Sequence, residues 1–152
     1  MAAPPVFAAL PARQEITMRI ILTGGFLGAG KTTLLHAAAN QLMAEGVAVG
    51  LVTNDQAPEL VDTALLAQSG AQVREVAGSC FCCNFNGFVS AARSLESAGC
   101  TVVLAEPVGS CTDLSATIAQ PLKALHPRWN LAPLSVLVDP LRVRQLLAGE
   151  YS

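Results

Sequence analysis

Short apolar runs alternate with longer amphipathic segments along the chain, and this alternation predicts strands that are each followed by a helix. Polar residues follow several of the apolar runs, among them Asn54 after the second run and Glu106 after the fourth. The predicted strands are residues 20–22, 47–52, 73–76, 101–105 and 134–138. The predicted helices are residues 32–42, 59–68, 87–98, 114–125 with a break allowed at Pro121, and 141–147.

A succession of strand and helix favours a parallel sheet with right-handed crossovers. Hydrophobic residues make up 52% of the chain and charged residues 13%, a balance that suits strands covered on both faces. We therefore predict an α/β fold of the P-loop NTPase type, with a mainly parallel sheet between two layers of helices. The 152 residues suffice for one domain, which we expect to span residues 18–152. Residues 1–17 contain three prolines and are expected to form a flexible extension.

Charge and cysteine content narrow the classes of function. The formal net charge is −2 and like charges do not cluster, so neither nucleic acid nor an anionic membrane is an expected partner. No apolar stretch reaches the roughly 18 residues of a membrane span, and the start of the chain lacks the pattern of a signal peptide. Five cysteines in such a chain indicate a reducing compartment, the cytoplasm, where thiols serve metals or redox chemistry.

Residues 25–33 match the pattern G-x-x-x-x-G-K-[ST] between a predicted strand and a predicted helix. Glycines allow the backbone N–H groups of such a loop to converge on phosphate oxygens at the start of the helix. Lys31 would contact the β- and γ-phosphates, Thr32 would bind Mg²⁺, and Thr33 would contact the α-phosphate. Capping of the helix is the alternative role for both threonines. The predicted nucleotide-binding residues of this loop are Gly25, Gly28, Ala29, Gly30, Lys31, Thr32 and Thr33.

Polar residues follow three further strands, at the edge of a parallel sheet where ligands bind. Glu106 ends an apolar strand and is predicted to hold Mg²⁺ through water, whereas a helix cap or a solvent-facing carboxylate is the alternative. Asp55 is a second candidate for Mg²⁺ or for positioning the attacking water, although an Asn-Asp pair is also ordinary loop chemistry. Gly109 could offer its N–H to the γ-phosphate and let its loop move.

Cys80, Cys82 and Cys83 follow the third predicted strand. Thiolates at this spacing can converge on one soft cation, and three sulfurs favour zinc or Cu(I) with one position left exchangeable. The alternative is a chance trio of buried cysteines. Cys111 lies at the same edge as a candidate fourth ligand to which we assign no role, and Cys100 is expected in the core.

The phosphate loop, the Cys-x-Cys-Cys cluster at 80–83 and Glu-x-x-Gly at 106–109 occur in the order found in the CobW-type family of GTP-binding metallochaperones, which the chain resembles from Met18 onward. The resemblance implies that GTP and Mg²⁺ bind at the loop, that the cysteines hold zinc or a similar transition metal, and that hydrolysis drives metal transfer to a client metalloprotein. It implies nucleotide and magnesium roles for Lys31, Thr32, Asp55 and Glu106, with Lys31, Asp55 and Glu106 also catalytic. It leaves open whether the protein is a homodimer.

The chain departs from that family at its end. It stops at Ser152, before an Asn-Lys-x-Asp-type motif that reads guanine and before a smaller C-terminal domain, so we expect a truncated GTPase domain. Two alternatives to a GTP-hydrolysing metallochaperone follow. One is a metal-sequestering or nucleotide-sensing module without turnover, and the other is a small-molecule kinase with a structural zinc, although no arginine-rich lid is evident.

Overall fold

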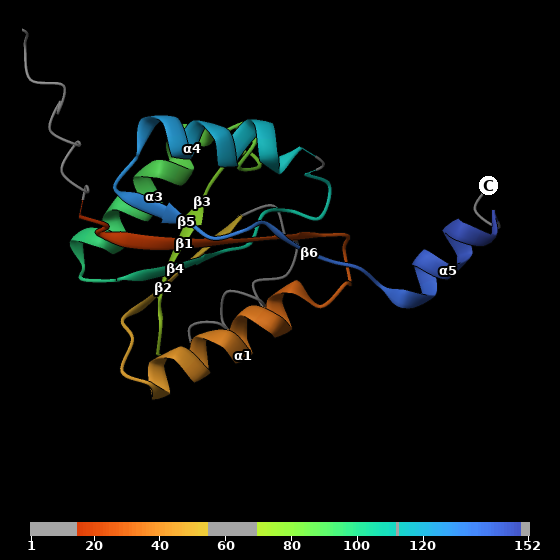
Figure 1. Cartoon of the computed structure of the whole chain (residues 1–152), viewed down its shortest axis with the longest axis horizontal. Helices are drawn as coiled ribbons and strands as arrows, with labels where there is room; N and C mark the ends of the chain where they lie inside the picture. Colours follow the sequence, from red (N-terminus) through yellow and green to blue (C-terminus); the bar gives the residue numbers. More distant parts are fainter. Residues whose placement is uncertain (1–14, 55–69, 112, 150–152) are drawn as a thin grey trace, which may run out of the picture.

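A parallel sheet forms the centre of the molecule (Figure 1). The computed structural model describes residues 15–54, 70–111 and 113–149. The strand order is β3-β2-β4-β1-β5, with β6 also pairing with β1, and every pairing is parallel. The strands are β1 (Met18–Gly25), β2 (Val49–Asn54), β3 (Gln72–Val76), β4 (Val102–Ala105), β5 (Trp129–Leu131) and β6 (Ser135–Leu137).

Helices cover both faces of the sheet, as predicted. In Figure 1, α1 lies below the sheet, and α3 and α4 lie above it. Neighbouring strand residues point to opposite faces, so Val103 packs in the core on the α3 side while Leu104 packs with Leu35 of α1. The helical segments are α1 (Lys31–Ala44), α3 (Phe85–Ser97), the π-helical turn η1 (Ser115–Ala119), α4 (Gln120–Leu125) and α5 (Pro140–Ala148).

Gly50 in β2 explains how closely α3 approaches the sheet. A Cβ atom at this position would lie 2.8 Å from a methyl carbon of Leu95, which is fully buried on α3. A glycine within a strand often marks such a close approach. The contact brings α3, and the loop that precedes it, against the sheet.

The last part of the sheet differs from the prediction. The predicted strand at 134–138 corresponds to β6, but β5 was not predicted. β5 pairs with the first part of β1 and β6 with its last part, and Pro133 between them has no N–H to donate. β5 and β6 are therefore two short pieces along one edge of β1.

The other elements agree with the sequence pattern where the structure describes them. The helix predicted at 114–125 continues through Pro121 by changing from η1 to α4, with the N–H of Gln120 bonded to the carbonyl of Ser115. The helix predicted at 59–68 and most of the predicted extension at 1–17 lie outside the described residues. Within the described ranges, no helix has the length and apolar character needed to cross a membrane.

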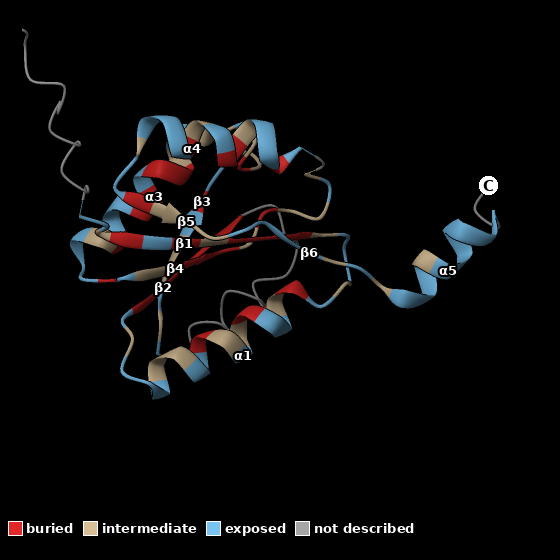
Figure 2. Ribbon diagram, viewed as in Figure 1, coloured by how far each residue is buried: buried red, intermediate tan, exposed pale blue. Residues whose placement is uncertain are grey.

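The C-terminal helix differs from the others in its surroundings. Figure 2 shows α5 almost entirely as exposed surface, and none of its residues is buried. It makes a polar contact with the segment between β1 and α1, where a guanidinium nitrogen of Arg142 donates to the carbonyl of Leu27 at 3.2 Å.

Candidate functional site

The loop between β1 and α1 folds back around its own lysine. Lys31 is 5% exposed, and its ammonium group donates to the carbonyls of Gly25 at 3.0 Å and Phe26 at 3.1 Å. Gly28 and Gly30 have φ angles of 80° and 90°, which residues with a Cβ atom rarely adopt. The glycines therefore determine the course of the loop, and the ammonium group of Lys31 is bonded to its carbonyls.

Two glycines let other segments press against this loop. A Cβ atom on Gly25, whose φ is 137°, would lie 2.5 Å from the carbonyl oxygen of Leu137 in β6. A Cβ atom on Gly109 would lie 2.6 Å from the backbone nitrogen of Leu27. The loop is thus confined by β6 and by the segment that follows β4, which explains why both positions require glycine.

Thr32 and Glu106 meet although they are 74 positions apart. The hydroxyl of Thr32 lies 2.9 and 3.0 Å from the two carboxylate oxygens of Glu106, to which it can donate. Gly30 precedes α1, and no side chain of the described residues caps this helix. The capping role considered for Thr32 is therefore not what the structure has, and its hydroxyl faces a carboxylate instead.

The cysteine loop is a tight turn between β3 and α3. The N–H groups of Cys83 and Asn84 both donate to the carbonyl of Cys80, at 3.0 and 2.9 Å. This turn brings the sulfurs of Cys80, Cys82 and Cys83 within 4.8 Å of one another. Phe81 points the other way, is fully buried, and lies 5.0 Å from the ring of Phe88 on α3. The thiols face outward while the intervening phenyl ring packs in the core.

Asn54 anchors the cysteine loop to the sheet. Its side-chain NH₂ group donates to the carbonyls of Val76 at 3.0 Å and Ser79 at 2.7 Å, directly before Cys80. In the sequence Asn54 is only a polar residue after a strand, because nothing local reveals a partner 25 positions away. Asp55, the next residue and a predicted magnesium ligand, lies outside the described residues.

The thiols of the loop shift one another's acidity. The hydrogen bond to Cys82 lowers the pKa of Cys80 from 9.0 to about 7. The same contact raises the pKa of Cys82 to about 11, and hydrogen bonding to Cys80 raises that of Cys83 to about 11. One thiolate is therefore stabilised by neighbouring S–H groups, and a soft cation can replace the remaining protons.

Cys111 lies beside this group of three cysteines. Its sulfur lies 3.5 Å from that of Cys82. It ends the same short segment that begins with Glu106 and contains Gly109, so this segment contacts Thr32, Leu27 and Cys82 in succession. Residues 106–111, which we call the bridging segment, physically join the phosphate loop to the cysteine loop. Cys100, in contrast, is 3% exposed and lies in the core, as predicted.

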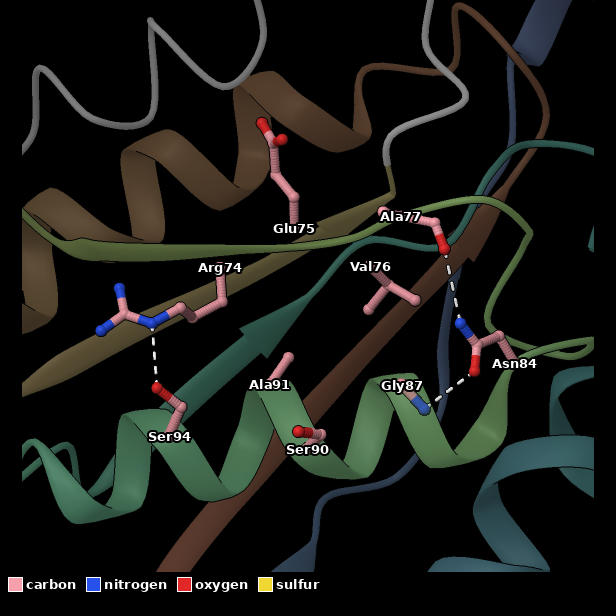
Figure 3. Close-up of a pocket in the computed structure, with 9 residues that line it drawn as sticks. All are labelled: Arg74, Glu75, Val76, Ala77, Asn84, Gly87, Ser90, Ala91 and Ser94. Atoms are coloured by element: carbon pink, nitrogen blue, oxygen red, sulfur yellow. Dashed lines mark hydrogen bonds between the residues drawn. The ribbon is translucent and has the colours of Figure 1, made fainter.

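A separate groove of about 390 Å³ runs between β3 and α3 (Figure 3). Arg74 crosses it and donates to the hydroxyl of Ser94 at 3.0 Å. At the other end, Asn84 accepts from the N–H of Gly87, which caps α3. None of the described residues predicted to bind nucleotide or metal lines this groove, so the groove is not part of the candidate site.

Comparison with known proteins places this geometry in a family. Residues 19–149 match the model of the CobW/HypB/UreG nucleotide-binding domain. The chain belongs to this family. Its predicted resemblance to CobW-type proteins is thereby confirmed.

Two curated relatives come from Escherichia coli (strain K12). The zinc chaperone YeiR is 46% identical over 66 residues, and the zinc chaperone YjiA is 34% identical over 65 residues. Each match covers 43% of this chain and 20% of the relative, so the matched residues span about a fifth of the length of either protein.

The similarity of the fold extends further than that of the sequence. The signal recognition particle receptor FtsY from Elizabethkingia anophelis superposes with a TM-score of 0.62 at 21% identity, over 86% of this chain and 46% of that one. Together with the parallel sheet and its two layers of helices, this likeness confirms the predicted α/β fold.

Proposed function

We propose that this chain is a GTP-binding and GTP-hydrolysing metallochaperone domain that holds zinc or a similar ion on its cysteine loop and couples metal transfer to nucleotide state. The observation that carries the proposal is the bridging segment, which contacts the phosphate loop at Gly109 and the cysteine group at Cys111. Membership of the CobW/HypB/UreG family and two relatives named zinc chaperones support it.

The phosphate loop fits the phosphates of a nucleotide. Lys31 supplies a charge within the loop, and the glycines leave the N–H groups at the start of α1 without a side-chain cap among the described residues. Such N–H groups bind anions well. Gly25, Gly28, Ala29, Gly30 and Thr33 would add backbone and hydroxyl contacts, with Gly109 beside them.

Thr32 and Glu106 fit a magnesium ion. A hydroxyl and a carboxylate that already lie within 3.0 Å of each other offer two oxygen donors at the edge of the phosphate loop. Magnesium would neutralise charge on the phosphates. Asp55, the next residue in the sequence after β2, remains our candidate for positioning the attacking water or for a further magnesium contact.

The metal to be transferred would bind to Cys80, Cys82 and Cys83. Their sulfurs are close enough to share one ion, and Cys83 is exposed to solvent, where a client metalloprotein can approach. Thiolates select soft cations such as zinc. The site requires reduced thiols, and all five cysteines are free, which suits a reducing compartment such as the cytoplasm.

Two measurements on the reduced protein test the proposal. Phosphate release from GTP and from ATP tests for turnover and for the choice of nucleotide, and we expect magnesium-dependent release. Titration of a non-hydrolysable GTP analogue with and without Zn²⁺ tests the coupling, and we expect zinc to change its Kd. Binding of both ligands without turnover would instead favour a sensing or sequestering module. Equal Kd values with and without zinc would contradict the coupling.

A further inference from the structure

We propose that Cys111 is a fourth sulfur ligand of the ion, so that the metal is bound by the cysteine loop and the bridging segment together. This inference rests on the proposed metal site at the cysteine loop. It adds a ligand from a different part of the chain, 29 positions away from Cys82. It also changes the kind of site, from a turn with three thiols to a pocket closed by two segments.

The sulfurs within 4.8 Å of one another are those of Cys80, Cys82 and Cys83, and Cys111 lies beside Cys82, so a four-sulfur site would draw Cys111 and the loop closer together. With Zn–S bonds of about 2.3 Å, tetrahedral geometry places neighbouring sulfurs about 3.8 Å apart. The sulfurs of Cys82 and Cys111 are separated by 3.5 Å, close to this value without any movement. Those of Cys80 and Cys82 are separated by 2.8 Å, so insertion of an ion would spread the loop by about 1 Å.

The bridging segment holds Cys111 in position. The N–H of Cys111 donates to the carbonyl of Val108 at 3.0 Å, which closes a turn, and its half-buried side chain packs against the core. In a transfer site, a half-buried sulfur would hold the ion more firmly than an exposed sulfur. Cys111 would retain the ion from inside, while Cys83 on the outside is free to release it.

Ligation by Cys111 also gives the coupling a physical route. The bridging segment contacts Thr32 through Glu106 and Leu27 through the backbone at Gly109. A bond from Cys111 to a metal would fix one end of this segment and so restrain Glu106, five residues earlier. We expect Cys111→Ser to bind metal through three thiolates and to lose most of the effect of metal on nucleotide affinity.

Cobalt substitution tests the ligand number directly. The reduced protein is titrated with Co²⁺, whose thiolate-to-metal charge-transfer absorbance grows with the number of sulfur ligands. We expect Cys111→Ser to keep about three quarters of the absorbance per bound ion, as three thiolates instead of four would give. Cys100→Ala is the matched control, because this cysteine lies in the core before β4 and should leave the absorbance unchanged.

The outcomes separate this inference from the proposed function. Full absorbance in Cys111→Ser would overturn the fourth ligand while leaving the three-cysteine site intact. No charge-transfer band in the unmutated protein would overturn the metal site itself. Circular dichroism monitors the fold of each variant. X-ray absorption of the unmutated zinc form gives a second test that needs no variant, since four sulfur neighbours support Cys111 and three overturn it.

Discussion

Two loops at the same edge of the sheet each lead into a helix, but only one of the two helices begins with a side-chain cap. The phosphate loop enters α1 through Gly30, with no side-chain cap among the described residues. The cysteine loop enters α3 through Asn84, whose side chain accepts from the N–H of Gly87. The first N–H groups of a helix have no partner within the helix. In α3 the N–H of Gly87 is bonded to a side chain, whereas no side chain among the described residues takes this place in α1, which leaves its first N–H groups available to a ligand.

This difference indicates what each loop can bind. An uncapped helix start beside a buried lysine attracts an anion. A capped helix start has used part of that capacity, so the cysteine loop offers side-chain sulfurs, which attract a soft cation. Ligands of opposite charge can therefore occupy neighbouring loops of one sheet edge.

Replacement of Lys31 should have the largest effect, and this effect concerns the binding of an anion by the phosphate loop. In Lys31→Ala the phosphate loop loses its charge, and hydrogen bonds to charged groups contribute about 1.5–3 kcal/mol each. With two such bonds to phosphate oxygens, we expect nucleotide affinity to fall at least about 100-fold. Isothermal titration measures the Kd, and Lys123→Ala on the exposed surface of α4 is the control. Equal losses in both variants would mean that general charge, and not the loop, attracts the nucleotide.

Glu106→Gln should have a smaller effect, confined to magnesium. The amide keeps a hydrogen bond with Thr32 but removes the charge that would attract the ion, so we expect about a tenfold loss of nucleotide affinity in magnesium. In EDTA the variant and the unmutated protein should bind alike. A loss of the same size in EDTA would show that Glu106 supports the loop and not a metal.

Asn84→Ala tests the other side of the comparison. Loss of a helix cap costs about 1 kcal/mol of unfolding free energy, and no protein group among the described residues replaces it for Gly87. Denaturant unfolding measures the change, with Asn86→Ala on the exposed surface of α3 as control. Nucleotide affinity should not change, and a clear reduction would mean that the two helix starts are not independent.

The smallest expected effect concerns the order in which thiols react. The hydrogen bond from Cys82 lowers the pKa of Cys80 to about 7, whereas the pKa of Cys83 is raised to about 11 by its contact with Cys80. Alkylation of the metal-free protein by iodoacetamide should therefore rise through pH 7 at Cys80 and should remain slow at Cys83 up to pH 9. Peptide mass spectrometry identifies the modified residue. Faster reaction at Cys83 would show that exposure outweighs acidity.

The sequence predicted the parts of the molecule that depend on neighbouring residues. Apolar runs and glycines placed the sheet, the phosphate loop and the cysteine turn, because strand, turn and motif are local properties. β5 was missed because three residues between Pro127 and Pro133 are too short for a clear pattern. Anchoring by Asn54 and the approach of Cys111 to Cys82 were also out of reach, since both depend on contacts across more than 20 positions.

The buried ring of Phe81 bears on what happens when the loop is empty. A loop organised by its ion alone would lose its shape on release, and reordering its backbone would cost about 1–2 kcal/mol for every residue. No sulfur takes part in the contact of Phe81 with Phe88, so we expect the ring to stay in place when an ion binds or leaves. The vacated turn would then keep its place against α3, as the repeated loading and delivery of the proposed function would require.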